Sequence, residues 1–167
     1  MEAIGLRPTT PRDLSFVLDA EEDPDNRPFI VAWSRKQHAA ALEDPDLGHS
    51  IIECPSSDRV GFVILAGLTN PHGSVEFRRM VVTAKRKGIG RAAVRLVKEI
   101  AFHRYHAHRL WLDVKRHNDR ARGLYEAEGF VAEGVLRECL RGEGGYESLV
   151  VMSMLASEYR EAHPECE

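Results

Sequence analysis

Two glycines and a group of basic residues lie together near the middle of the sequence. Gly88 and Gly90 are surrounded by four cationic side chains, which are Lys85, Arg86, Lys87 and Arg91. An apolar run ends just before this segment and a helical pattern begins at Ile89, so the glycines lie where a strand passes into a helix. The first N–H groups of a helix are unpaired and lie at the positive end of its dipole, and glycine lets a phosphate approach them. The segment therefore indicates a pyrophosphate-binding loop, although a plain strand-to-helix turn with solvated lysines has the same residues.

The glycine segment also fits the dinucleotide-binding pattern G-x-G-x-x-G/A, because residues 88–93 read G-I-G-R-A-A. Asp113 follows about 20 residues later, as recognition of a ribose requires. Three features argue against this interpretation. Residues 83–87 separate the first glycine from the end of the strand, Asp113 is followed by Val114 and so can lie inside its own strand, and the chain is short for a dinucleotide domain plus a substrate domain. An NAD-binding domain stays as an alternative.

A second motif follows the next strand and is more specific than the glycine segment. Residues 118–130 read N-D-R-A-R-G-L-Y-E-A-E-G-F, which matches the pattern N-x-x-A-x-x-L-Y-E-x-x-G-F. The earlier K-R-K-G-I-G matches (Q/R)-x-x-G-x-(G/A), with Lys85 where Gln or Arg is preferred. With both motifs in this order and spacing, residues 76–155 resemble the GNAT superfamily of N-acetyltransferases, and within it the ribosomal-protein and polyamine acetyltransferases.

The resemblance implies that acetyl-CoA is the co-substrate and that particular residues bind it. The pantetheine arm is expected along the strand at Met80, Val81 and Val82, where a backbone N–H near Val81 or Val82 stabilises the developing oxyanion. Asn118 is expected to contact the cofactor from the far side of the site. The pyrophosphate is expected at the backbone N–H groups of Arg86, Lys87, Gly88, Ile89, Gly90 and Arg91.

Tyr125 occupies the position where the family usually has its general acid, which protonates the departing thiolate. A phenol with a pKa of about 10 is protonated at pH 7 and can donate to a thiolate whose pKa is about 8.5. Without the motif, Tyr125 reads as a core aromatic on the inner face of its helix. The candidate general base is Glu76, on the strand that leads to the cofactor, acting directly or through water. The alternative for Glu76 is a solvated strand carboxylate.

The function expected from these residues is transfer of an acetyl group from acetyl-CoA to a primary amine, by direct attack of the amine on the thioester. The acceptor is a small molecule or a protein N-terminus. A weak base favours amines of low pKa, because neutralising an amine of pKa about 8 at pH 7 costs about 1.4 kcal/mol, whereas a lysine costs about 5 kcal/mol. A non-catalytic acyl-CoA-binding module is the alternative.

Acceptor contacts are expected from two loops, residues 21–32 and 142–146, because loops carry function in such folds. The first loop contains a run of acidic side chains, which are Glu21, Glu22, Asp23 and Asp25. This run could attract a cationic amine. A solvated acidic loop is the simpler interpretation.

The pattern of apolar residues around the motifs gives the element order β-α-α-β-β-β-α-β-α-β-β. Helices are expected to start near Thr10, Ser34, Gly88 and Asn118. Strands are expected at residues 3–7, 51–54, 60–66, 75–82, 108–114, 130–136 and 147–155. The unit from residue 75 to residue 114 requires a parallel crossover, while the hairpins require antiparallel neighbours. We therefore expect an α/β protein in one domain over residues 1–167, with a mixed, mostly antiparallel sheet of about seven strands and about four helices. The resemblance implies that this is the GNAT acyltransferase fold.

Composition excludes several classes of function. The 167 residues carry a net charge of −3, whereas a protein that binds nucleic acid in bulk is usually basic. No apolar run approaches the roughly 18 residues that span a membrane, and the first residues do not read as a signal peptide. We therefore expect neither a nucleic acid nor a membrane as a partner. The expected partner is the amine acceptor, and a homodimer is the candidate assembly, because related enzymes often form dimers.

Cysteine and histidine content bears on compartment and on metals. The three cysteines, Cys54, Cys139 and Cys166, are odd in number and lack metal-ligand spacing, which favours a reducing, cytoplasmic setting. Three histidines cluster between a helix and a strand, which are His103, His106 and His108. Their spacing does not place three ligands on one face, so no metal site is expected.

Overall fold

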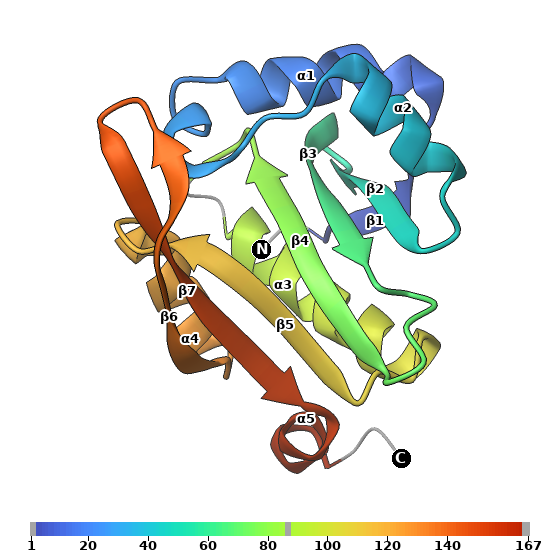
Figure 1. Ribbon diagram of the computed structural model, residues 1–167. Helices are drawn as coiled ribbons and strands as arrows, with labels where there is room; N and C mark the ends of the chain where they lie inside the picture. Colours follow the sequence, from blue (N-terminus) through green and yellow to red (C-terminus); the bar gives the residue numbers. More distant parts are fainter. Residues whose placement is uncertain (1–2, 86–87, 165–167) are drawn as a thin grey trace.

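The computed structural model describes residues 3–85 and 88–164, and its centre is a seven-stranded sheet in the order β1-β2-β3-β4-β5-β7-β6 (Figure 1). The strands are β1 Gly5–Pro8, β2 Leu47–Cys54, β3 Ser57–Ala66, β4 Ser74–Val82, β5 Arg109–Lys115, β6 Val131–Gly142 and β7 Gly145–Leu155. Strands β4 and β5 pair in parallel, and the other neighbouring strands pair antiparallel. The expected mixed, mostly antiparallel sheet is confirmed.

The described residues contain five α-helices, one more than the roughly four that the sequence indicates. They are α1 Leu14–Glu22, α2 Arg35–Glu43, α3 Ile89–Glu99, α4 Asp119–Ala127 and α5 Ala156–Ala162. Short single turns precede or follow several of them, at Pro11–Asp13, Arg27–Phe29 and Ile100–Arg104. The helix that the sequence does not predict is α5. It follows β7 with no intervening turn residue, and it is too short to show a helical period. The Leu155 N–H donates to Glu158 Oε2 at 2.8 Å and caps its start.

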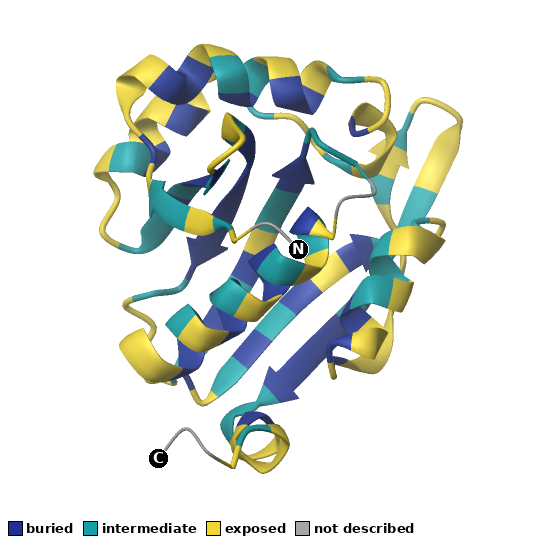
Figure 2. Cartoon of the chain, turned by 180° about the vertical axis from the view of Figure 1, so that it is seen from behind, coloured by how far each residue is buried: buried dark blue, intermediate teal, exposed yellow. Residues whose placement is uncertain are grey.

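Helices cover both faces of the sheet, and the alternation of strand side chains divides the core accordingly (Figures 1 and 2). Helix α1 packs on one face, with Val17 and Ala20 in a small apolar cluster. Helices α3 and α4 pack on the other face in a larger cluster. Consecutive residues of the central strands belong to different clusters: Ile51 and Ile52 in β2, Phe62 and Val63 in β3, and Val81 and Val82 in β4.

The centre of the sheet is split because β4 and β5 pair over a short length only. Their parallel register covers Ser74–Glu76 in β4 and Arg109–Trp111 in β5. Beyond these residues β4 carries a bulge, since Ile64 of β3 lies opposite Arg79 while Leu65 lies opposite Phe77. A bulge inserts one residue, here Arg78, and bends the strand. The second half of β4 therefore leaves β5, and the two strands diverge.

A buried carboxylate ties α1 to β4. Glu21 is 1% exposed, and its Oε1 atom lies 2.5 Å from Nη1 of Arg79. The Trp33 N–H donates to Glu21 Oε2 at 3.1 Å, and His38 Nε2 lies 3.2 Å from the same oxygen without well-aligned hydrogen-bond geometry. Burial alone would raise the pKa of Glu21, but His38 and Arg79 lower it below its ordinary value. The interpretation of Glu21 as part of a solvated acidic loop is therefore wrong, because its charge compensates a buried guanidinium.

The polar chain continues from α2 to the edge of the sheet. His38 Nδ1 lies 3.1 Å from His49 Nε2, and His49 Nδ1 lies 2.8 Å from the Thr9 hydroxyl. All three side chains are buried. Burial lowers the pKa of His49 to about 4, so this imidazole is neutral at pH 7. The chain links β1, β2, α2 and α1 to β4 through polar contacts inside the core.

The Glu21–Arg79 pair yields a test of stability. In Glu21→Gln the buried Arg79 guanidinium loses its counter-charge, so we expect a loss of about 3–5 kcal/mol in the free energy of unfolding by urea. The matched control is Glu22→Gln, one residue along the same helix, where the side chain is 63% exposed and 3.6 Å from Arg27. This control is expected to stay within about 0.5 kcal/mol of the wild type. Equal effects of the two substitutions would contradict the account.

A glycine in β3 keeps β4 in place and gives a second test. A Cβ atom at Gly61 would overlap the Val81 carbonyl oxygen and lie 3.1 Å from Val82 Cα. We expect Gly61→Ala to displace β4 and to lower the free energy of unfolding by about 1–3 kcal/mol, as overpacking does. The control is Gly134→Ala in β6, where a Cβ atom has nothing within 4 Å. Comparable urea midpoints for Gly61→Ala and the wild type would show that the contact does not constrain β4.

Candidate active site

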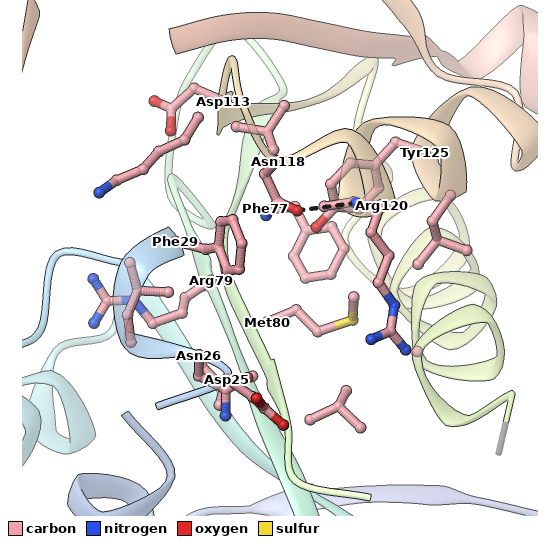
Figure 3. Close-up of a pocket in the computed structure, with 18 of the residues that line it drawn as sticks. Asp25, Asn26, Phe29, Phe77, Arg79, Met80, Asp113, Asn118, Arg120 and Tyr125 are labelled. Atoms are coloured by element: carbon pink, nitrogen blue, oxygen red, sulfur yellow. Dashed lines mark hydrogen bonds between the residues drawn. The ribbon is translucent and has the colours of Figure 1, made fainter. Parts of the chain in front are cut away.

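A cavity of about 730 Å³ opens where β4 and β5 diverge (Figure 3). It is lined by β4 from Glu76 onward, the start of α3, the end of β5, one face of α4 and the segment between α1 and α2. The β6–β7 hairpin adds Leu140 and Leu149. The cavity thus joins the two motifs that the sequence carries, although they lie on different helices. We call the part next to α3 and α4 the α3 side, and the part next to the α1–α2 segment the α1 side.

The glycine segment forms the α3 side of the cavity. Gly88 caps α3 with a φ of 73°, a left-handed conformation that favours glycine. Among the described residues, Ala92 is the first whose N–H bonds back within the helix, to Gly88 O at 3.1 Å, and the amides of Ile89, Gly90 and Arg91 have no described helical acceptor. All four residues from 88 to 91 line the cavity. The other two predicted pyrophosphate ligands, Arg86 and Lys87, lie outside the described residues.

Gly90 is less constrained than Gly88. A Cβ atom at Gly90 would lie 3.6 Å from Leu124 Cδ2 and 3.8 Å from Met80 Cε, which are ordinary van der Waals distances. The protein itself therefore has room for alanine at this position. The short distances also show that the start of α3, α4 and β4 converge on one point of the cavity.

Cationic side chains gather on the α3 side. Lys85 donates from Nζ to Asn26 Oδ1 and so bridges the end of β4 to the α1–α2 segment. Partial burial, together with Arg120 nearby, lowers the pKa of Lys85. Arg91 and Arg120 also line the cavity. Together with the open amides of α3, these side chains produce a positive region suited to phosphates.

The edge of β4 presents main-chain groups to the cavity. The Thr83 N–H donates to Val60 O of β3 at 2.9 Å. Because hydrogen-bonding direction alternates along an antiparallel strand, Val81 bonds to β3, whereas the N–H and C=O groups of Met80 and Val82 point to the opposite edge. At that edge β5 has already diverged. This geometry favours Val82 over Val81 as the residue with an available amide.

Asn118 and Tyr125 of the second motif both face the cavity, beside Phe77 of β4 (Figure 3). Asn118 Oδ1 accepts the Ala121 N–H at 3.2 Å, so this side chain caps α4 and its Nδ2 remains as a donor. Tyr125 is 8% exposed and makes edge-on ring contacts with Phe77 and Phe130. Burial raises the pKa of Tyr125, so the phenol stays protonated well above neutral pH. The core-aromatic interpretation and a proton-donor role are therefore compatible in geometry.

Two carboxylates from neighbouring strands line the cavity on the other face of the sheet. Glu76 accepts two hydrogen bonds from the Arg78 guanidinium, at 2.7 and 3.1 Å. Asp113 lies within β5 and not at its tip, and none of the described residues forms an ion pair or hydrogen bond with its carboxylate. Burial, and then the negative charge of Glu76, raises the pKa of Asp113. In the sequence, Asp113 is a candidate only for binding a ribose. Its alternation with Leu112 and Val114 nevertheless predicts that it lies on the opposite face of the sheet from those two residues.

The α1 side of the cavity has apolar walls. Phe29, Ile30 and Val31 come from the α1–α2 segment, as expected for residues 21–32. From the hairpin, the lining residues are Leu140 and Leu149 rather than the turn at residues 142–146. The sequence gives no signal for these two leucines, because the length of the hairpin strands decides which residue reaches the cavity.

Lys115 holds the two walls of the α1 side together. Its Nζ atom donates to Pro28 O at 3.0 Å and lies 2.7 Å from Glu147 Oε2. Arg79 Nη2 donates to Val31 O at 2.6 Å, and its guanidinium lies 4.8 Å from the centroid of the Trp33 ring. These contacts fix the α1–α2 segment against β4 and β5.

Among residues 3–85 and 88–164, no group of three or more His, Cys, Asp or Glu side chains is placed to hold a metal ion.

Comparison with known proteins agrees with this geometry. The acetyltransferase (GNAT) family matches residues 14–130. A spermidine N(1)-acetyltransferase from Vibrio cholerae serotype O1 is 30% identical over 167 residues, covering 93% of this chain and 95% of the relative. A spermidine N(1)-acetyltransferase from Escherichia coli K12 is 24% identical over 172 residues, covering 96% of this chain and 90% of the relative.

The fold is also shared with solved structures. A spermidine N-acetyltransferase from Vibrio cholerae in complex with CoA and spermine superimposes with a TM-score of 0.84, at 24% identity, over 93% of this chain and 97% of that one. The family match covers more than half of the chain and contains most of the residues that line the cavity. This chain belongs to the GNAT family of acetyltransferases and is an acetyl-CoA-dependent N-acetyltransferase.

Proposed function

We propose that Tyr125, Asp113 and the exposed amides at the end of β4 carry out the acetyl transfer, with direct attack of a primary amine on the thioester. One observation carries this proposal. The divergence of β4 and β5 leaves the amides of Met80 and Val82 without a partner strand, between Tyr125 on one face of the sheet and the carboxylates on the other. A thioester lying along β4 would therefore have a proton donor on the α3 side and a proton acceptor on the α1 side.

In this proposal, main-chain groups bind acetyl-CoA more than side chains do. The open amides of Ile89, Gly90 and Arg91 and the cations beside them would bind the pyrophosphate. The pantetheine arm would pair with the free edge of β4 as an added strand does. The Nδ2 group of Asn118 is available to a carbonyl of the same arm. Arg86 and Lys87 stay predicted contacts of the phosphates.

In the reaction, the ammonium of the acceptor first loses a proton to the Asp113 carboxylate. The neutral amine then attacks the thioester carbon, a C–N bond forms, and the amide of Val82 or Met80 stabilises the oxyanion. The C–S bond breaks as the oxyanion collapses, and the departing thiolate takes the proton of the Tyr125 hydroxyl. The remaining proton of the acetylated nitrogen passes to solvent. The proton held by Asp113 returns through solvent to the Tyr125 oxygen, so that amide, thiol and one released proton are the products.

Glu76 has a different role from Asp113 in this proposal. The Arg78 guanidinium donates two hydrogen bonds to one Glu76 oxygen, so this carboxylate already has a cationic partner. Asp113 has no such partner, and its raised pKa makes it the stronger base. Glu76 thus contributes to the raised pKa of Asp113, in place of the general-base role that the sequence suggests for Glu76.

We propose further that the chain is one N-acetyltransferase domain over residues 1–167 that works in the cytoplasm. The single sheet and the coverage of the relatives support one domain. The two cysteines that the structure describes, Cys54 and Cys139, are free thiols, as in a reducing compartment. Among the described helices, none has the length and apolar character required to cross a membrane. The amine acceptor is the proposed partner, and nucleic acid is not, because the net charge is −3.

We also propose that the chain forms a homodimer through β6. This strand lies at the edge of the sheet, and its apolar residues Val131, Val135 and Leu136 are exposed. Exposed apolar groups on an open strand edge favour pairing with another chain. A related spermidine N-acetyltransferase from Vibrio cholerae is described as dodecameric, which supports self-association in this family.

The role of Tyr125 is tested by removing one oxygen. Tyr125→Phe keeps the ring and its contacts with Phe77 and Phe130, so acetyl-CoA affinity should change by no more than a few-fold. We expect kcat, measured by thiol release, to fall by about 10²- to 10⁴-fold. Tyr105→Phe, whose side chain lies outside the cavity lining, is the control and should retain full turnover. Near-normal kcat in folded Tyr125→Phe would remove the proton-donor role.

The two carboxylates are separated by their pH profiles. Asp113 accepts a proton only when ionised, so kcat/KM should fall as the pH drops through its raised pKa. In Asp113→Asn, the acidic limb of the pH profile, where kcat/KM falls as the pH drops, should disappear. The value of kcat/KM should also fall by about 10²- to 10⁴-fold. Glu76→Gln removes the like charge, so the pKa of Asp113 should fall and the limb should move to lower pH. If Glu76→Gln abolishes the limb and Asp113→Asn does not, Glu76 is the base.

The assembly is tested by sedimentation. Leu136→Lys places a charge in the exposed apolar row of β6, so a dimer formed there should dissociate to the mass of one chain, 18.8 kDa. Glu138→Lys, on the same strand and without an apolar side chain, controls for the added charge. A wild-type protein that sediments as a monomer at high concentration would contradict the dimer.

A further inference from the structure

Ion pairs compensate most of the carboxylates on the α1 side of the cavity. Arg79 is paired with Glu21, Arg78 with Glu76 and Lys115 with Glu147, at 2.5, 2.7 and 2.7 Å. Within the described residues, two carboxylates of the lining on this side have no ion pair: Asp113 of β5, and Asp25, which interacts electrostatically with Lys85. Next to the free edge of β4, the α1 side therefore offers the charge of Asp113 to a ligand.

The walls around this charge are apolar and partly uncovered. Phe29 is 39% exposed and Val31 is 57% exposed, although both line the cavity. Leu140 and Leu149 are half-buried on the facing hairpin. Contacts from Arg79 to Val31 O and from Lys115 to Pro28 O hold the segment that carries these side chains, so their exposure belongs to a fixed wall. Exposed apolar side chains in a cavity indicate an apolar ligand that covers them.

We propose that the acceptor is a primary monoamine with an apolar body, such as an arylalkylamine or a branched alkylamine. This inference rests on the proposed transfer function, whose site it specifies. The ammonium pairs with Asp113, next to the exposed edge of β4, and the apolar body lies against Phe29, Val31 and Leu140. An N-terminal residue with an apolar side chain presents the same chemistry, and the test below separates the two sources.

The charge distribution opposes a polyamine acceptor. Every further ammonium group would need another carboxylate, since burying an unpaired charge is costly. Glu76, Glu21 and Glu147 already compensate Arg78, Arg79 and Lys115. Asp25 lies beside Asn26 and away from Asp113, in the region where Lys85, Arg91 and Arg120 make the cavity cationic (Figure 3). A polycation would meet like charges in that direction.

The first experiment compares acceptors by thiol release from acetyl-CoA with the wild-type protein. The panel is phenethylamine, isoamylamine, a tripeptide with an N-terminal Leu, and spermidine. We expect kcat/KM for the better of the apolar amines or the tripeptide to exceed that for spermidine by about 10-fold or more, the discrimination that an apolar pocket provides. The higher value among these acceptors identifies the source as a free amine or a peptide N-terminus.

The second experiment uses variants of the wall with phenethylamine as acceptor. Val31→Ser should raise KM and lower kcat/KM by about 10-fold, with little change for ethylamine, which has no body to reach the wall. Val31→Ile is the matched control, because it keeps an apolar side chain at the same place in the cavity wall. Val31→Glu should improve spermidine relative to phenethylamine, because it adds a carboxylate to the apolar wall.

The outcomes separate this inference from the function on which it rests. Spermidine turning over better than every apolar acceptor, or Val31→Ser behaving like Val31→Ile with phenethylamine, overturns the monoamine inference and leaves the acetyltransferase function intact. Thiol release with none of the amines, although acetyl-CoA binds, overturns both.

Discussion

The parting of β4 and β5 is the constraint on which the site depends. Two parallel strands at the centre of a sheet normally satisfy each other's main-chain groups along their whole length. Here they pair over Ser74–Glu76 and Arg109–Trp111 only, and the bulge at Arg78 bends β4 away. The N–H and C=O groups of Met80 and Val82 are left at an inner edge of the sheet, where an extended ligand can satisfy them. The same split lets side chains from both faces of the sheet reach one cavity.

Two groups of polar contacts hold the split open. On the α1 side, Glu21 and Arg79 tie α1 to β4 immediately after the bulge. On the α3 side, the buried Glu128 carboxylate lies 3.1 Å from Arg95 and from Lys98, and 3.4 Å from Arg91, which joins the end of α4 to α3. Both carboxylates have pKa values held below the ordinary value by their cationic partners, against the opposing effect of burial. Charges buried in this way cost stability when one partner is removed, so they fix geometry on either side of the cavity.

The sequence predicts what is encoded locally. The motif of residues 118–130 and the glycine segment identify the family from the sequence, because each must form a specific turn or cap. Gly88 takes a left-handed φ, and Asn118 caps α4. Alternating apolar residues predict the strands of the mixed sheet. The roles of Tyr125, Glu76 and the β4 amides stay predictions, although every one of those residues lines the cavity.

Features that depend on distant contacts were not accessible from the sequence. Glu21 looks like one of several solvated acids until its partner Arg79, 58 residues away, is known. Asp113 gains its raised pKa from burial and from Glu76 on a neighbouring strand. Leu140 reaches the cavity because β6 extends to Gly142, well beyond residue 136, where the apolar pattern ends. Helix α5 has too few residues for a periodic signal. In each case the determinant is spatial neighbourhood rather than local pattern.

The most direct measurement is a crystal structure of the protein with a bisubstrate analogue, in which the acceptor nitrogen is joined to the acyl group of coenzyme A. The account predicts the acyl oxygen within hydrogen-bond distance, about 2.7–3.1 Å, of the Val82 or Met80 N–H. It also predicts the sulfur next to the Tyr125 hydroxyl and the acceptor nitrogen next to Asp113. An acyl group bound away from the free edge of β4, or a sulfur out of reach of Tyr125, would contradict the account.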